Sequence, residues 1–222
     1  MTVRARASKR LLIYSLLTAT VAMAAWLYGL LFDSSGLLRN LFVTLSFLGL
    51  GILIKYADQA YDEDVYSRRA TLLMAVPGGL WMGALIAVDG GAATICLGLL
   101  FALLVAGKYD NLPFRIGFVV ALIFGIAAVL LGGSTFSLLG ALIVLAAAFV
   151  DEKANDLPGV DGGSDWKAVL FHHRPFLKVA VLALCLVGIL PSLLYFFAFL
   201  AFDFGYVLVE ALSVPTEAPA LG

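Results

Sequence analysis

Charged residues are scarce in this chain: Asp, Glu, Lys and Arg make up only 13% of its 222 residues. Soluble domains carry about a quarter of such residues, whereas 63% of this sequence is hydrophobic. A large soluble portion is therefore excluded. The net charge of −1 and the absence of a long basic run give no indication of nucleic-acid binding. The composition is that of an integral membrane protein.

Residues and motifs typical of soft-metal and nucleotide sites are equally few. Cys96 and Cys185 lie within apolar runs, where small buried residues are more typical than a disulfide. His172 and His173 are adjacent, so on a helix their side chains diverge by ~100° and do not easily face one ion. We expect both at the membrane interface. Gly132-Gly133-Ser134 lacks the GK[ST] of a phosphate-binding loop. These absences disfavour a histidine metal centre and a nucleotide-binding loop.

Long apolar runs fill most of the sequence. A transmembrane helix needs ~20 mainly apolar residues, and the basic segment 1–10 precedes a run too long for a signal peptide. Pro191 lies near the middle of the stretch 176–212, which is therefore either one long helix or two short ones. We predict an all-α fold, a polytopic transmembrane helical bundle of seven to eight spans. It forms a single transmembrane domain over 1–222, with helices at about 11–32, 37–57, 70–88, 91–107, 114–132, 135–150, 176–190 and 192–212.

The connections between these runs alternate in length and charge. Three of them, at 33–36, 89–91 and 132–134, are short and glycine-rich, which predicts helical hairpins. The hairpins form a weak internal repeat, or simply follow the usual pattern of charged inner loops. If the N-terminus is inside, only Arg39 of the 14 Lys and Arg residues falls outside. This bias predicts a cytoplasmic N-terminus and a cytoplasmic loop at 151–175. We expect a multi-pass protein of a cell membrane, of prokaryotic type.

Acidic clusters follow the second, fourth and sixth runs, all on the predicted cytoplasmic side. Asp58 and Asp62 are four residues apart, as are Glu152 and Asp156, so each pair would share one helix face. Mg²⁺ prefers such oxygen ligands and often bridges them to substrate phosphate. We predict a Mg²⁺ site with the metal ligands Asp58, Asp62, Asp151, Glu152 and Asp156. Alternatively, Asp58 and Asp62 belong to a solvated helix end whose acids pair with Arg68 and Arg69, and Asp151, Glu152 and Asp156 form a capped, hydrated loop start.

The remaining charged residues suggest further roles. The candidate catalytic acids are Asp58, Asp62, Glu152 and Asp156. Asp110 either adds to this set or pairs with Lys108 or Arg115. Candidate phosphate contacts are Lys55, Arg68, Arg69, Lys108, Arg115 and Lys153, and Arg174 is a further cation on the same side. The alternative is that these cations fix the topology and touch anionic lipid. We expect Asp64 to point into solvent, and Gly79 and Gly83 to pack helices within the bundle.

The two acidic motifs resemble those of the UbiA-type intramembrane prenyltransferases. The family motif NDxxDxxxD follows the second helix, and here Ile54 to Asp62 keeps the last two acids with Lys55 in place of the first. The family motif DxxxD follows the sixth helix, and Glu152 to Asp156 keeps its spacing with Glu first. The family usually has nine helices, more than are predicted here. The resemblance implies Mg²⁺-dependent transfer of a prenyl group from a prenyl diphosphate to an acceptor, with Asp58, Asp62, Glu152 and Asp156 as ligands of the metal and diphosphate.

Two other functions fit the same sequence. A cation or solute transporter would use the acids as an ion site, although such sites lie near the membrane midplane. A non-catalytic membrane subunit would use its acidic loops to dock a partner. If a prenyl tail is bound, Phe47, Trp81 and Phe118 are candidates to line its tunnel, and are otherwise plain packing residues.

Overall fold

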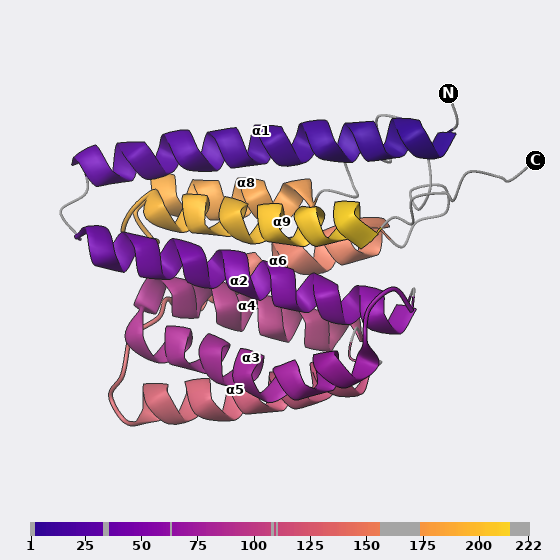
Figure 1. Ribbon diagram of the computed structural model, residues 1–222. Coiled ribbons are helices and arrows are strands. Elements are labelled where there is room, and N and C mark those ends of the chain that lie inside the picture. The colour runs from indigo at the N-terminus through magenta and orange to yellow at the C-terminus, as the bar shows by residue number, and fades with distance from the viewer. Residues whose placement is uncertain are drawn as a thin grey trace, which may run out of the picture.

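The computed structural model describes residues 3–32, 36–62, 64–107, 109, 111–155 and 174–213. Every regular element within these ranges is a helix, which confirms the predicted all-α fold (Figure 1). The helices are α1 (Val3–Phe32), α2 (Leu37–Asp62), α3 (Arg68–Val88), α4 (Gly90–Ala106), α5 (Leu112–Leu130), α6 (Leu138–Asn155), α8 (Pro175–Leu186) and α9 (Leu194–Ser213).

Four of these helices are long and apolar enough to cross a membrane: α2 over Leu37–Tyr61, α3, α5 and α9. The helices α4 and α8 are apolar but shorter. Large apolar side chains such as Leu73, Leu130 and Leu131 lie exposed on the outside of the bundle, as expected for contact with lipid chains. The chain thus has the character of an integral membrane protein.

The helices run back and forth along one direction, so their ends gather at two ends of the bundle (Figure 1). At one end, α2 and α6 finish and α3, α5 and α8 begin, and most of the charged side chains lie there; we call it the charged end. At the opposite end, α3 leads into α4 through Asp89 alone. This residue ends α3 and its carboxylate accepts a hydrogen bond from the Ala92 backbone N–H of α4. The predicted hairpin connection at 89–91 is therefore a turn built on one capping residue.

Neighbours in sequence are not the closest partners in packing. The helix α9 lies between α1 and α2, which barely touch each other (Figure 1). The most extensive contacts join α2 to α9, α3 to α5 and α4 to α6, and in each pair the two helices run in the same direction. The predicted connections at 89–91 and 132–134 do reverse the chain, but the helices that they join are not the closest packing partners. Most of the predicted connection at 33–36 lies outside the described residues.

Glycines allow the close approach in each of these three pairs. A Cβ atom on Gly51 of α2 would strike the Phe202 backbone of α9, and one on Gly98 of α4 would strike Val144 of α6. Between α3 and α5, Gly79 faces the Gly117 carbonyl and Val120, and Gly83 faces Phe124. Small residues at such contacts let membrane helices approach backbone to backbone. The prediction that Gly79 and Gly83 serve the bundle is confirmed.

Several predicted helix ends need correction. The second helix continues to Asp62 rather than 57, and the sixth runs over 138–155 rather than 135–150. Apolar length marks the membrane-spanning part of a helix, but polar residues continue the helix beyond it. As a result Asp58 lies within α2, and Asp151 and Glu152 lie on α6 instead of in the predicted loop at 151–175. The stretch 176–212 forms two helices, α8 and α9, which are joined by a turn that contains Pro191.

Candidate functional site: a two-ended cavity

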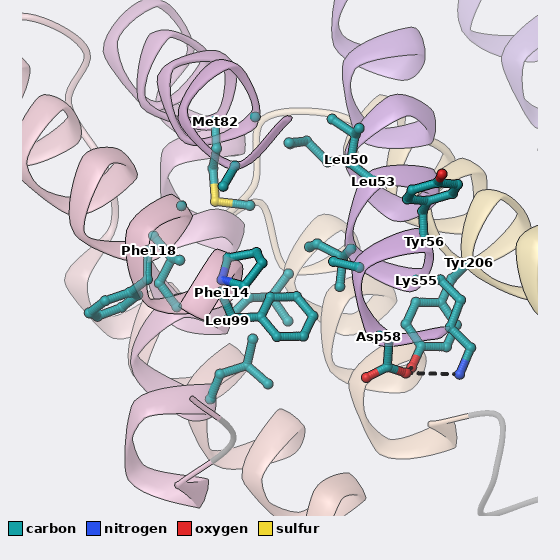
Figure 2. A pocket seen from close by; sticks show the side chains of 18 of the residues that line it. Leu50, Leu53, Lys55, Tyr56, Asp58, Met82, Leu99, Phe114, Phe118 and Tyr206 are labelled. Atoms are coloured by element: carbon teal, nitrogen blue, oxygen red, sulfur yellow. Dashed lines mark hydrogen bonds and ion pairs between the residues drawn. The ribbon is translucent and has the colours of Figure 1, made fainter. Parts of the chain in front are cut away.

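A cavity of about 450 Å³ lies inside the bundle. Its apolar part, which we call the apolar arm, lies among α2, α3, α4 and α5 and is lined by Leu50, Leu53, Met74, Gly78, Met82, Leu99, Leu103, Phe114 and Phe118, among others. Its polar end lies toward the charged end of the bundle and is lined by Lys55, Asp58, Glu152, Arg174, Tyr206 and Glu210. Figure 2 shows the two parts, with Met82 and Phe118 away from Lys55, Asp58 and Tyr206. A cavity of this volume is typical of small-molecule sites.

The helix α2 contributes an ion pair to the polar end. Lys55 Nζ lies 2.9 Å from Asp58 Oδ2, one helical turn further on (Figure 2). The Tyr206 hydroxyl of α9 donates a hydrogen bond of 3.3 Å to the same carboxylate oxygen. Lys55 is only 7% exposed, and its ammonium lies 4.8 Å from the centre of the Tyr206 ring. The buried ammonium thus has a carboxylate and an aromatic ring as its neighbours.

A second ion pair comes from α6 and α8. Arg174, directly before α8, lies 2.9 Å from Glu152 of α6, and its guanidinium lies 4.9 Å from the same Tyr206 ring. Burial on its own lowers the pKa of the Arg174 guanidinium, but the neighbouring Tyr206 and Glu152 raise this pKa above its ordinary value. Arg174 is therefore a permanent cation. Lys55 and Arg174 thus both lie close to the Tyr206 ring, and both line the cavity.

The Asp151 carboxylate accepts hydrogen bonds from the backbone and forms no part of these two ion pairs. Asp151 is 1% exposed, and its two carboxylate oxygens accept hydrogen bonds from the backbone N–H groups of Phe176 (3.1 Å) and Leu177 (2.7 Å). These groups belong to the first turn of α8, where N–H groups have no partner within the helix. The geometry favours Asp151 as an anchor for α8 over its predicted role as a metal ligand.

Of the six predicted phosphate contacts, Lys55 lines the cavity. Arg68 forms an ion pair of 2.6 Å with Asp64 and donates to the Ala60 carbonyl, which ties the start of α3 to the end of α2. Arg115 donates to the Tyr109 carbonyl at 2.8 Å. Arg69 and Lys153 are exposed. These four are not among the cavity-lining residues, and the contacts of Arg68 and Arg115 fit a structural role.

The remaining predicted residues cannot be placed at the site. Lys108, Asp110 and Asp156 lie outside the described residues, as do His172, His173 and the side chain of Asp62. Asp58 and Glu152 are therefore the predicted catalytic acids whose position the structure gives, and both line the cavity. They lie far apart in sequence, so the fold brings together one acid from each predicted motif.

Arg174, a further cation of the predicted cytoplasmic side, also lines the cavity. Two lining residues were missed by the sequence-based site, Tyr206 and Glu210, although both belong to a polar stripe in the last apolar run. The same stripe includes Asp203, whose carboxylate pairs with Lys178 of α8 at 3.0 Å. Polar residues within a membrane helix mark functional or structural sites. Of the aromatic residues considered for a tail tunnel, Phe118 lines the cavity, Phe47 is in the core and Trp81 is exposed.

The polar end suits Mg²⁺ in its chemistry. Three carboxylates line it, Asp58, Glu152 and Glu210, against the two cations Lys55 and Arg174, so the described lining carries one excess negative charge. No group of three or more acidic, His or Cys side chains arranged to hold a metal occurs within the part of the chain that the structure describes. Mg²⁺ does not need such a cage, because it commonly binds through one or two carboxylates, substrate phosphates and water. The donor set therefore fits a Mg²⁺ ion that arrives with a phosphorylated substrate.

The opposite end of the bundle holds a structural ion pair. Arg39 of α2 lies 3.0 Å from the buried carboxylate of Asp89 and donates a hydrogen bond of 2.9 Å to the Tyr195 hydroxyl of α9. Asp89 also caps α4. The cation predicted to lie alone on the outer side thus joins three helices.

No family model, curated protein or solved structure matches this chain. The proposals below are therefore argued from the cavity.

Proposed function

We propose that this protein is an intramembrane enzyme that acts, with Mg²⁺, on a prenyl diphosphate and transfers its prenyl group to an acceptor. The observation that carries the proposal is the two-ended cavity. Its polar end offers cations and carboxylates, and its apolar arm is lined by Leu, Met and Phe side chains. A ligand that fills both parts must have a charged head and an apolar tail. The proposal agrees with the resemblance of the acidic motifs to the UbiA-type prenyltransferases.

The residues of the polar end have distinct proposed tasks. Asp58 and Glu152, with Asp62 and Asp156 as the predicted further ligands, hold the metal. Lys55 and Arg174 donate hydrogen bonds to phosphate oxygens, Lys55 as a point charge and Arg174 as a fork. When bound, Mg²⁺ neutralises the negative charge that develops on the departing diphosphate. The apolar arm keeps water away from the allylic cation that remains.

The proposed orientation places the charged end in the cytoplasm. All of the polar-end residues then lie on the cytoplasmic side, where a soluble diphosphate donor can enter. The support for this orientation is the distribution of Lys and Arg, of which Arg39 alone belongs to the opposite end in the predicted topology. The identity of the acceptor is left open.

Binding of a non-hydrolysable donor tests the proposal. Purified protein in nanodiscs is titrated with farnesyl thiolodiphosphate, in Mg²⁺ and in EDTA, by calorimetry. We expect binding that depends on Mg²⁺ and that is lost in Asp58→Asn and Glu152→Gln. Asp64→Asn is the matched control, because Asp64 is exposed and pairs with Arg68 away from the cavity. If the unsubstituted protein binds no analogue in either condition, the enzyme proposal is wrong.

One observation favours transport as a second candidate. The buried pair of Lys178 and Asp203 lies deeper than the polar end, since Asp203 is near the middle of α9. Ionisable residues at this depth often belong to ion or proton paths. Proton and cation flux into liposomes that contain the protein tests this function. Flux that is lost in Asp203→Asn would support it, and tight liposomes would exclude it.

A further inference from the structure

One face of α3 lines the cavity from Thr71 to Met82. Thr71, Met74, Gly78 and Met82 recur at intervals of three or four residues, so their side chains form one stripe on the helix. At 1.5 Å per residue this stripe is about 16 Å long. It begins beside the polar end, because Arg68 ties the start of α3 to the end of α2. The apolar arm therefore extends away from the charged groups along α3.

Gly78 is the position in this stripe that has no side chain, and it lies between Met74 and Met82. A Cβ atom added to it would meet one neighbour within 4 Å, the Leu53 Cδ1 atom of α2 at 3.5 Å. This distance is an ordinary van der Waals contact. Leu53 also lines the cavity, so the added atom would enter the cavity rather than a packed interface.

The next residue, Gly79, is a glycine for a different reason. Its Cβ would collide with the Gly117 carbonyl and with Val120 of α5. Helix packing thus requires glycine at 79 but not at 78. Glycine destabilises a helix interior relative to alanine, so Gly78 needs another explanation. An open cavity at this position supplies one.

The size of the cavity limits what can occupy it. Its volume of about 450 Å³ lies in the lower half of the range for small-molecule sites. It suits a single apolar chain rather than the two chains of a bilayer lipid. The charged head of the same molecule would occupy the polar end, with which the arm is continuous.

We propose that Gly78 determines the length of the tail that this protein accepts. The ligand is a single-chain isoprenoid whose head lies between Lys55 and Arg174 and whose tail passes Gly78 and ends against Met82. A side chain at position 78 closes the arm and leaves room only for a short tail. This inference rests on the proposed function and adds the residue that selects among its substrates.

The test compares three tails in three variants. Gly78→Ala, Gly78→Val and Gly78→Phe are titrated in nanodiscs, in Mg²⁺, with the thiolodiphosphates of dimethylallyl, geranyl and farnesyl alcohol. We expect unchanged affinity for the dimethylallyl probe. Affinity for the farnesyl probe should fall in the order Ala, Val, Phe, by roughly tenfold or more where the side chain overfills the arm. Val76→Phe is the control, because Val76 is 44% exposed on the outside of the same helix.

The thermal unfolding temperature of each variant separates folding from binding. Gly78→Ala should unfold at the same or a higher temperature, so its binding result can be interpreted even if Gly78→Phe does not fold. An equal loss of affinity for all three probes, or an unchanged affinity for the farnesyl probe in Gly78→Val, would overturn the inference and leave the proposed function standing. If no probe binds the unsubstituted protein, the proposed function is itself contradicted.

Discussion

Asp151 gives the sharpest distinction between two roles, metal ligand and helix anchor. In Asp151→Ala the first turn of α8 loses both of its carboxylate acceptors, on the Phe176 and Leu177 N–H groups. Loss of a capping side chain costs ~0.5–2 kcal/mol, and a hydrogen bond to a charged group contributes ~1.5–3 kcal/mol. Because Asp151 is almost fully buried, water cannot easily replace it. We expect a loss of about 2–3 kcal/mol in the free energy of unfolding.

For a chain of this length, such a loss lowers the unfolding temperature by roughly 4–12 °C. Thermal unfolding is followed by circular dichroism in detergent, at one scan rate for all variants because membrane proteins often unfold irreversibly. Asp151→Asn keeps one acceptor oxygen, so its unfolding temperature should fall less than that of Asp151→Ala. Glu152→Gln is the comparison variant, because Glu152 is the neighbouring residue and lines the cavity.

A second measurement completes the comparison. Mn²⁺, used as a spectroscopic substitute for Mg²⁺, is titrated in the presence of farnesyl thiolodiphosphate and followed by electron paramagnetic resonance. We expect unchanged Mn²⁺ affinity in Asp151→Ala and weaker affinity in Glu152→Gln. The opposite pattern, an unchanged unfolding temperature together with lost Mn²⁺ binding in Asp151→Ala, would show that Asp151 is a metal ligand and that the anchoring argument is wrong.

Three further predictions follow from the packing and from the acidic motifs. Gly79→Ala should lower the unfolding temperature, because the new methyl group meets the backbone of α5, whereas Gly78→Ala should not; equal effects in thermal scans would contradict the assigned roles. Asp89→Ala removes the cap of α4 and the partner of Arg39 and should cost about 2 kcal/mol, to be measured by chemical unfolding; a loss within error would refute the structural role of this pair. Asp62→Asn should abolish Mg²⁺-dependent turnover of a prenyl diphosphate, while Asp64→Asn should keep most of it; full activity of Asp62→Asn in a radiolabelled-donor assay would remove Asp62 from the site.

The approximate positions of the helices could be read from the sequence, since long apolar runs mark them, and four of these helices are long and apolar enough to cross a membrane. Their ends could not, because polar residues such as Asp58 and Glu152 continue a helix without adding to its apolar length. The acidic candidates were found for a similar reason: carboxylates next to apolar runs stand out in any membrane protein.

The sequence did not predict which side chains contact each other in the folded protein. Asp151 and Glu152 are adjacent in the chain, yet one anchors α8 and the other lines the cavity, because neighbouring side chains on a helix point in different directions. Arg174 and Tyr206 became site residues only when α8 and α9 packed beside α2 and α6. Composition and periodicity thus determined that this chain forms a bundle of apolar helices with acids at one end. The tertiary structure decided which of those acids meet, because that depends on backbone contacts made by glycines far apart in the chain.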